Sequence, residues 1–317
     1  FIFYLVFSQG FLKVRTLMMV LLSAISVSAF IGIFQYVFQE SVGLYFLGEP
    51  HISADALDVA RYSFANETVM RAYGTFSHPN VFAGFLLFAI FFSTYFWKES
   101  KGEYRVLLTL LMMVLLLALV LTFSRSGWLA LFGGAMLYYA VSNVKLSVKY
   151  VSLAASLLLL FVVVFDLSDI IFSRIFIGDS NSIMERNLYY KAGWNMFLNS
   201  PFGVGAGNFT EVMQQFLSLK LEPWRFQPVH NIFILVLNEL GVIALSIFMG
   251  IFVYVFAMML KALKKIKDME MNYMLLALCL GIFVIGLFDH YFISLYQGQF
   301  LFWVFLILFR MRFTSSR

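Results

Sequence analysis

Charged residues are scarce in this chain of 317 residues, and so is cysteine. Charged residues make up 12% of the sequence, hydrophobic residues make up 62%, and the mean hydropathy is +0.88. Ordinary soluble domains carry about 25% charged residues, so the composition excludes that class and indicates a membrane protein. The single cysteine, Cys279, excludes a disulfide within the chain, and its place in an apolar run suggests a packing role.

Recognisable signals for a metal or a nucleotide are also lacking. The four histidines, His51, His78, His230 and His290, show no ligand spacing such as i, i+4, and no carboxylate cluster accompanies them. The glycines of residues 203–207 have a G-x-G-x-G spacing with no predicted strand before them, which is not a dinucleotide fingerprint. We therefore expect no metal and no cofactor. The net charge of +5 follows from the loop charges described below, so we expect no nucleic-acid partner.

Long apolar runs, in contrast, recur along the whole chain. A run of about 20 apolar residues is long enough to cross a bilayer as a helix. Residues 1–12 look like the end of one further helix, and the absence of an initiating Met predicts that the chain is truncated at its N-terminus. We predict an all-α polytopic membrane fold, formed by residues 1–317 as a single membrane domain. The predicted membrane helices are residues 17–38, 81–97, 106–123, 128–142, 151–166, 230–258, 271–290 and 297–310.

The distribution of charge orients these helices. Of the 22 basic residues, 14 lie in short connections that hold only 4 of the 17 acidic residues. Cytoplasmic loops of membrane proteins are enriched in Lys and Arg, so these connections are predicted to be cytoplasmic. The alternate loops, 39–80 and 167–229, then face outward, and loop 167–229 is predicted to cover an active site. The cytoplasmic basic residues are Lys13, Arg15, Lys98, Lys101, Arg105, Lys145, Lys149, Lys261, Lys264, Lys265, Lys267, Arg310, Arg312 and Arg317.

The tightest outer connection contains an arginine. Arg125 stands in the stretch Thr122-Phe-Ser-Arg-Ser-Gly-Trp128 between two long apolar spans. A guanidinium at the membrane surface is costly unless it meets carbonyl groups, an acid or an anionic ligand. Arg125 is therefore either a ligand-binding residue or a capping or snorkelling residue. For Arg61, Lys220 and Arg225 we expect the simpler role of loop residues paired with acids.

A second arginine opens a helix in the outer loop. The stretch Ser182-Ile-Met-Glu185 has the form of a capping box, which predicts a helix that starts near Ile183. Arg186 and Lys191 follow among aromatic residues, which suits sugar and pyrophosphate binding. The apolar positions also recur at near-helical spacing, which suits a helix lying along the membrane interface. These apolar positions are Ile183, Tyr190, Trp194 and Phe197.

A glycine turn follows this helix. The stretch Pro201-Phe-Gly-Val-Gly-Ala-Gly207 predicts a tight turn before another helix at 209–219. Glycines such as Gly205 and Gly207 leave backbone N–H groups open to a phosphate, although the pattern alone is a weak signal.

His230 is the sharpest single candidate for catalysis. It begins a long apolar span, where water meets lipid. Its unperturbed pKa of about 6.5 suits proton transfer near neutral pH, although a histidine here can equally satisfy an interfacial hydrogen bond. Asn231 is predicted to share its polar side, whereas Glu239 falls on the opposite face of the helix. His290, beside Asp289 at a helix end, is an alternative proton acceptor.

Together these stretches resemble the O-antigen ligase and polymerase family of integral membrane glycosyltransferases. No single element is specific for this family. Five elements in the family's order, at matching topological positions, are specific for it. The resemblance covers about residues 65–310. The five elements are Arg71-Ala-Tyr-Gly-Thr-Phe-Ser-His-Pro-Asn80-Val-Phe-Ala83, the stretch around Arg125, Arg186 with Trp194, the glycine turn continuing to Phe209, and His230-Asn231 with Glu239-Leu-Gly241.

The resemblance implies transfer of a glycan from a polyprenyl-pyrophosphate carrier to a hydroxyl of a lipid, glycan or protein acceptor. It implies a site on the outer face of the bacterial cytoplasmic (inner) membrane and a reaction without nucleotide sugar, ATP or metal. On this resemblance His230 acts as base toward the acceptor hydroxyl. Arg125 and Arg186 bind the pyrophosphate and stabilise charge on the leaving group. This division of roles is chemically sensible, because pyrophosphate is a good leaving group and needs mainly positioning and cationic stabilisation.

The remaining site residues are expected to bind substrate. Arg71 and Asn80 either line the donor groove or hold the loop to the helix. Arg174 and Lys191 could add positive charge to the donor site, and Gly205, Gly207 and Asn231 are expected beside the substrate.

Two alternatives remain open at this point. Within the family, a ligase and a polymerase use the same donor and base, so the sequence does not separate them. From another class, a transporter or flippase of lipid-linked oligosaccharides would need broken or charged helices near the bilayer midplane. Glu239 is the main residue in favour of transport. A purely structural role leaves the outward arginines unexplained.

Overall fold

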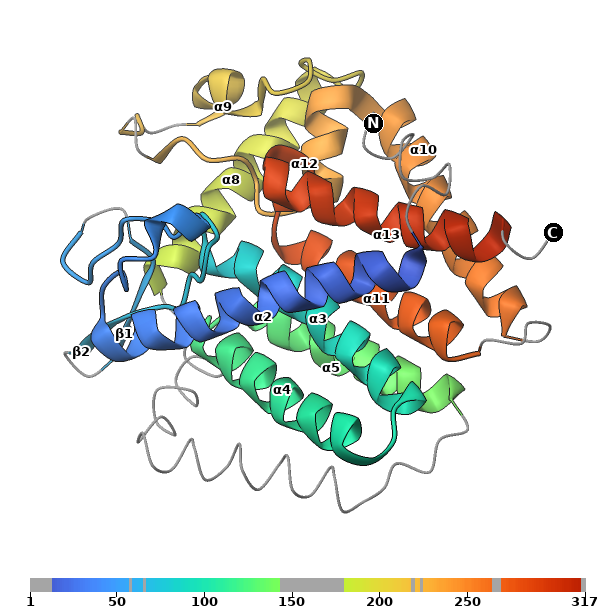
Figure 1. Ribbon diagram of the computed structural model, residues 1–317. Helices are drawn as coiled ribbons and strands as arrows, with labels where there is room; N and C mark the ends of the chain where they lie inside the picture. Colours follow the sequence, from blue (N-terminus) through green and yellow to red (C-terminus); the bar gives the residue numbers. More distant parts are fainter. Residues whose placement is uncertain are drawn as a thin grey trace.

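The computed structural model of the protein describes residues 13–56, 59–64, 67–142, 180–217, 220–222, 225–263 and 269–314. The predicted helices 1–12 and 151–166, together with Arg174, lie outside these residues. The described part of the chain is mainly helical, as the sequence predicts, and its long helices pack side by side (Figure 1).

Seven long helices correspond to seven of the eight predicted membrane helices. Five of them are long and apolar enough to cross a membrane: α2, α3, α4, α10 and α11. Of the other two, α5 has 17 residues and α13 has 19. The fold class is therefore an all-α polytopic membrane protein, while the number of crossings stays a prediction. The helices are α2 Val14–Phe38, α3 Pro79–Glu99, α4 Gly102–Leu121, α5 Arg125–Val141, α10 Ile232–Ala262, α11 Met269–Phe288 and α13 Tyr296–Thr314.

Burial, more than hydropathy, distinguishes the central helices from those at the periphery. Inside a bilayer both protein-facing and lipid-facing side chains are apolar, so a hydropathy profile reads them alike. In α3, 83% of the apolar window is buried, whereas the figure is 28% for α4 and 17% for α10. Helix α3 packs against α2, α4, α5 and α11, which makes it the central helix of the bundle.

A short β-hairpin interrupts the first predicted outer loop, residues 39–80, and the sequence did not predict it. Strands β1 (Arg61–Phe64) and β2 (Glu67–Met70) pair antiparallel, with Arg61 opposite Met70. Tyr62 on β1 is buried and stacks on Phe123, with ring centroids 5.7 Å apart. The hairpin therefore docks on the turn between α4 and α5, and the chain leaves β2 directly into Arg71.

Helix α10 is broken at Gly241, where the sequence predicts a continuous helix. Gly241 has φ 83° and ψ 177°, and the segment 201–207 inserts its backbone at the break. The Val204 and Gly205 amides donate to the carbonyls of Asn238 and Glu239, each at 2.9 Å. A Cβ on Gly241 would lie 2.4 Å from the Phe202 carbonyl carbon, so the two backbones touch and glycine is required. The broken helix thus keeps its carbonyl groups satisfied, as a membrane interior demands.

The helices of the predicted outer loop 167–229 differ in detail from the predictions. Helix α8 (Ser180–Asn199) already includes Ser182, so the predicted capping box is wrong and the helix begins before Ile183. Tyr189, Ala192 and Met196 form its buried face. Trp194, which the predicted apolar stripe included, is 59% exposed. The predicted helix 209–219 is shorter and changes type: it comprises α9 (Phe209–Val212) and a 3-10 turn (Met213–Phe216).

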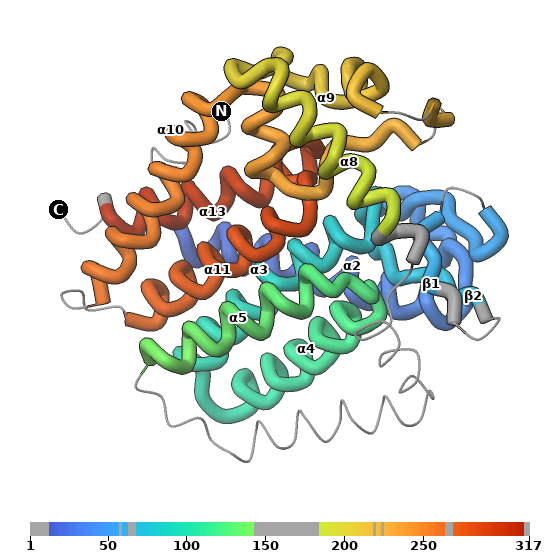
Figure 2. Tube along the Cα trace, turned by 180° about the vertical axis from the view of Figure 1, so that it is seen from behind, coloured from blue at the N-terminus to red at the C-terminus, as the bar shows by residue number. Residues whose placement is uncertain are grey.

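The two ends of the bundle differ in character. Helices α3, α5 and α10 begin at one end, and α4 and α11 finish there. Figures 1 and 2 both place the β-hairpin and α8 at this end. The short connection between α3 and α4 lies at the opposite end, with Lys98 and Lys101 beside it. The predicted outer loops and predicted cytoplasmic connections therefore lie at opposite ends of the bundle.

Candidate functional site

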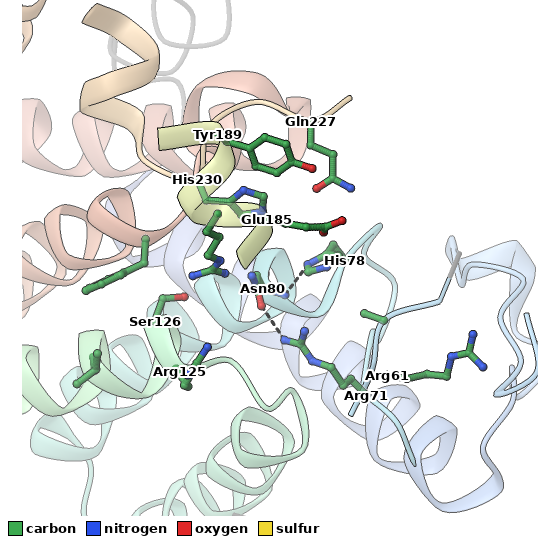
Figure 3. Close-up of a pocket in the computed structure, with 14 residues that line it drawn as sticks. Arg61, Arg71, His78, Asn80, Arg125, Ser126, Glu185, Tyr189, Gln227 and His230 are labelled. Carbon is green, nitrogen blue, oxygen red and sulfur yellow. Dashed lines mark hydrogen bonds between the residues drawn. The ribbon is translucent and has the colours of Figure 1, made fainter. Parts of the chain in front are cut away.

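A cavity of about 580 Å³ lies at the end of the bundle that carries the β-hairpin and α8 (Figure 3). Its walls come from the hairpin, the starts of α3 and α5, α8, the end of α11 and the segment before α10. Polar and cationic side chains dominate the lining. The lining residues are Ala60, Arg61, Arg71, His78, Asn80, Arg125, Ser126, Leu129, Glu185, Arg186, Tyr189, Gln227, His230 and Phe288.

Three helices present their N-termini to this cavity. At α3 the His78 ring caps the helix, because its Nδ1 accepts the Asn80 amide at 3.1 Å. At α5 the Ser124 hydroxyl accepts the Gly127 amide at 3.3 Å. At α10 the Asn231 side chain accepts the Phe233 amide at 2.9 Å and the Ile234 amide at 3.1 Å. Helix N-termini carry partial positive charge, so their convergence favours an anionic ligand.

Arg71 is buried and held by bonds to two other parts of the bundle. Its Nε donates to the Thr122 carbonyl at 2.6 Å and its Nη2 to Asn80 Oδ1 at 2.7 Å. The Asn80 amide in turn donates to Asp289 Oδ2 at 2.7 Å. These bonds hold the loop before α3 to the helix, and both residues also line the cavity, so both predicted roles stay open.

Arg125 and Arg186, which are 61 positions apart, meet at the same cavity. Arg125 is the first residue of α5 and follows a strained turn, in which Phe123 has φ 48°. Three aromatic rings hold Phe123 in place, and its strain is compensated by this packing. These rings belong to Tyr36, Tyr62 and Trp128. Arg186 projects from α8. Burial is the main cause that lowers the pKa values of His230 and His290, and the charge of Arg186 lowers them further.

His230 lies just before α10 and lines the cavity as a neutral imidazole. Its ring stacks on Tyr189 at 6.3 Å and meets His290 edge-on at 5.1 Å. Burial lowers the pKa of His230 to about 4, with further lowering from His290 and Arg186 and an opposing effect from Asp289. Its buried Nδ1 makes no hydrogen bond to the described residues. At neutral pH the ring is therefore unprotonated and able to accept a proton.

Asp289 lies beside the cavity, and it was named from the sequence only as the neighbour of His290. It is 5% exposed and accepts hydrogen bonds from the Asn80 side chain and, at 2.9 Å, from the His290 backbone. Burial alone would raise the pKa of Asp289, but the nearby His290, His230 and His78, with the Asn80 bond, hold it below its ordinary value. The sequence did hold a sign of this role: an acid directly after a membrane helix is costly unless other residues pair with it, so partners for Asp289 could have been expected. Its partner Asn80 lies 209 positions away in the chain.

The histidines separate into a cluster and one outlier. His78, His230 and His290 act on one another electrostatically around Asp289. His290 itself bonds to Ser294, with 2.5 Å between Nδ1 and Oγ, and its pKa is lowered by burial. His51 stacks on Tyr45 instead and does not line the cavity. The described residues contain no group of three or more His, Cys, Asp or Glu arranged to hold a metal ion.

Several predicted site residues have other surroundings. Lys191 is exposed on α8 and is absent from the cavity lining. Asn231 is committed to the α10 cap and to the Leu287 carbonyl, at 3.1 Å. The Gly205 amide is committed to the break in α10, and Gly207 is exposed nearby. None of these four residues is part of the cavity lining, and their predicted part in substrate binding stays a prediction.

Other cavity residues come from positions that the sequence reading did not single out as site residues. Tyr189 donates its hydroxyl to the Arg225 carbonyl at 2.8 Å, and Arg225 pairs with Glu185 at 2.9 Å, as expected for an ordinary loop arginine. Arg61 lines the cavity, yet its Nη1 donates to the Ala54 carbonyl at 2.9 Å and its side chain points away from His230 (Figure 3). Aromatic and amide residues of this kind have no distinctive spacing, so only the fold identifies them.

The comparison with protein families covers the central part of this site. No curated protein matches the chain. Residues 108–249 match the family model described as O-antigen ligase. The matched segment contains Arg125, Arg186 and His230, and it lies within the region 65–310 that carries the sequence resemblance. This part of the chain is therefore similar to the O-antigen ligase family, which supports the resemblance seen in the sequence.

Proposed function

We propose that this protein transfers a glycan from a polyprenyl-pyrophosphate carrier to an acceptor hydroxyl, as a ligase or polymerase of surface polysaccharide. The observation that carries the proposal is the cavity, in which arginines and three helix N-termini surround a neutral histidine. Such an arrangement suits an anionic substrate whose reaction releases a proton. We further propose that this cavity faces the outer side of the bacterial cytoplasmic membrane.

The chemistry divides between the cations and the base. The bond between the anomeric carbon and the phosphate oxygen breaks, and its electron pair stays on the departing polyprenyl pyrophosphate. The acceptor oxygen bonds to the anomeric carbon and gives up its proton to His230. Arg125 and Arg186 neutralise the charge that grows on the pyrophosphate, as pre-oriented guanidinium groups do in other phosphate sites.

The low pKa of His230 fits this order of events. An unprotonated ring is ready to accept a proton, but a pKa of about 4 makes it a weak base in the empty cavity. A bound pyrophosphate brings negative charge beside the ring and raises its pKa. The donor thereby strengthens the base that its own reaction requires.

A transporter of lipid-linked oligosaccharides is the second candidate, and the break in α10 favours it. Transporters often bind substrates at broken helices near the bilayer midplane. Here, however, the carbonyls of Asn238 and Glu239 at the break are bonded to the 201–207 backbone. The cationic cavity lies at one end of the bundle, which supports the transferase over the transporter.

Complementation of a deletion strain tests the proposal. Variants His230→Ala and Arg186→Ala should abolish surface polysaccharide while the lipid-linked donor accumulates on the outer face. Lys191→Ala is the matched control, because it removes a cation from the same helix outside the cavity, and it should restore wild-type polymer. Arg186→Lys should lower transfer about tenfold or more, since Lys does not reproduce bidentate pairing. Accumulated long chains would identify a ligase and single repeat units a polymerase, whereas donor trapped on the cytoplasmic face would establish a transporter.

A further inference from the structure

His78 lines the cavity, but the proposed reaction, with His230 as base and Arg125 and Arg186 as pyrophosphate ligands, gives it no role. It is the N-cap of α3, the central helix, and it lines the cavity together with Asn80 (Figure 3). Its ring meets Tyr73 edge-on at 6.3 Å, and the Tyr73 hydroxyl accepts the Ala60 amide at 2.5 Å. The imidazole is therefore fixed from two sides, by the helix start and by the loop before it.

The cap fixes the tautomer of this ring. The Asn80 backbone N–H donates to Nδ1 of His78, so Nδ1 carries no proton. Burial, with Arg71 as the next contribution, lowers the pKa of His78 to about 3, and the ring is neutral at physiological pH. In a neutral imidazole with a bare Nδ1, the proton resides on Nε2. His78 is thus a fixed hydrogen-bond donor.

The donor atom faces away from the helix and finds no partner in the described residues. Nδ1 points to the first turn of α3, and Nε2 lies across the ring from that turn. The only hydrogen bond of the His78 ring within the described part of the chain is the one at Nδ1. Because His78 lines the cavity, this N–H is available to a ligand there.

The electrostatics around His78 favour an anionic acceptor. Arg71 acts on the ring directly, and the α3 N-terminus adds partial positive charge. The nearby Asp289 carboxylate is engaged by the Asn80 side chain and the His290 backbone. A phosphate oxygen meets these conditions better than a sugar hydroxyl does, since a hydroxyl gains nothing from the positive potential.

We propose that His78 donates its Nε2–H to an oxygen of the donor's pyrophosphate group, as a third ligand of the leaving group beside Arg125 and Arg186. This inference rests on the proposed glycosyl transfer. When the glycosidic bond breaks, the electron pair moves onto the phosphate oxygen, and the His78 N–H stabilises the charge that develops. No proton leaves His78 in this step, so its role differs from that of His230.

Three substitutions separate this role from capping. His78→Asn keeps both an acceptor for the Asn80 amide and an outward N–H donor. His78→Ser keeps only the acceptor, because the hydroxyl caps helices but is too short to reach across the cavity. His78→Ala removes both. A purely structural role predicts that the Asn and Ser variants behave alike, since both are good caps.

The test measures binding of undecaprenyl pyrophosphate and glycan transfer from a lipid-linked donor with the purified full chain. We expect His78→Ser to weaken pyrophosphate binding and lower kcat about 10- to 100-fold, the usual loss for a hydrogen bond to a charged group. His78→Asn should stay within about threefold of wild type on the same scale, and both variants should unfold at the wild-type temperature.

The two proposals fail in different ways. If the Ser variant binds pyrophosphate and transfers glycan as well as the Asn variant, the role of His78 as a pyrophosphate ligand is overturned while the transferase stands. An equal loss of binding and transfer in both variants has the same meaning. If wild-type protein neither transfers glycan nor binds undecaprenyl pyrophosphate, and Arg186→Ala changes nothing, the proposed function falls and this inference falls with it.

Discussion

Individual side chains at this site are positioned by partners on distant helices. The chain Arg71–Asn80–Asp289 joins the loop before α3, the first turn of α3 and the end of α11 through two hydrogen bonds of 2.7 Å. Asp289 thereby holds a negative charge beside His230 and His290 without itself lining the cavity.

The pH dependence of transfer follows from the lowered pKa of His230. In the proposed mechanism the unprotonated ring is the active form, and the free protein has a pKa of about 4 for this group. The acid limb of kcat/KM, which reports the free enzyme, should therefore lie well below the value of about 6.5 for an ordinary histidine. We expect a plateau from pH 8 down to about pH 5, followed by loss. An acid limb centred near pH 6.5 would show that His230 is exposed or is not the base.

Replacing Asp289 by Asn should weaken the base. The Asp289 charge raises the pKa of His230, so its removal lowers that pKa further and makes the ring a poorer proton acceptor. We expect kcat to fall about tenfold, with the acid limb moving to lower pH. Asn also keeps a hydrogen-bonding group of the same size for Asn80. An unchanged kcat with an unchanged acid limb would exclude an electrostatic role for Asp289.

Single residues also show what the sequence could predict. Arg125 and His230 were candidates because polar residues at the ends of apolar spans need a reason to be there, and Arg186 because it stands among aromatic residues in a loop helix. All three line the cavity. Asp289 and His78 were not candidates of this kind, because their roles depend on contacts made after folding. Asn231, Gly205 and Lys191 attracted attention by type and position. Asn231 and Gly205 are engaged in hydrogen bonds with the backbone, and Lys191 is exposed outside the cavity lining.

At the level of secondary structure, the break in α10 is the main departure from the sequence pattern. Apolar periodicity runs through residues 230–258 without interruption, and Gly241 alone gives little sign of a break. The break depends on residues 201–207, whose backbone completes the hydrogen bonds that the helix lacks. Insertion of one segment's backbone into another helix is a tertiary event that no local pattern records. The capping box in α8 failed for a related reason, since the helix continues upstream of it.

Substitution of Gly241 tests the break in α10. Gly241→Ala adds a Cβ at a φ of 83° and 2.4 Å from the Phe202 carbonyl carbon. We expect destabilisation of at least about 1–3 kcal/mol from the backbone strain alone. It should appear as a lower unfolding temperature in detergent and as reduced transfer, because the break positions the start of α10.

Gly250 in the same helix provides the control. Its added Cβ meets no atom within 4 Å, so Gly250→Ala should be neutral or slightly stabilising. If the two alanine variants unfold at the same temperature, the backbone contact at Gly241 is not as close as described.

At the scale of the whole molecule, the bundle has a cationic cavity at one end and short basic connections at the other. The sequence correctly predicts the membrane class and seven of the described helices, because composition and span length suffice for these. The match over residues 108–249 supports the resemblance to the O-antigen ligase family. The placement of α3 at the centre is beyond sequence reasoning, since protein-facing and lipid-facing residues are equally apolar. The site also needs segments from Arg71 to Asp289, which only the folded bundle brings together.

Orientation in the membrane can be checked by cysteine labelling. With Cys279 replaced by Ser, Lys191→Cys on exposed α8 should react with a membrane-impermeant maleimide in intact spheroplasts. Lys101→Cys, between α3 and α4 at the other end, should react only after permeabilisation. The opposite pattern would place the cavity in the cytoplasm and remove the proposed outward site.

The most direct test of the central claim uses purified protein reconstituted in liposomes with a polyprenyl-pyrophosphate-linked glycan and an acceptor, without ATP or nucleotide sugar. Release of polyprenyl pyrophosphate and formation of the glycosylated acceptor are measured together. We expect equal amounts of both products from wild type, and at least about a 100-fold loss of both in His230→Ala with donor binding retained. Movement of intact donor between leaflets without cleavage, unaffected by His230→Ala, would contradict the transferase and identify a transporter.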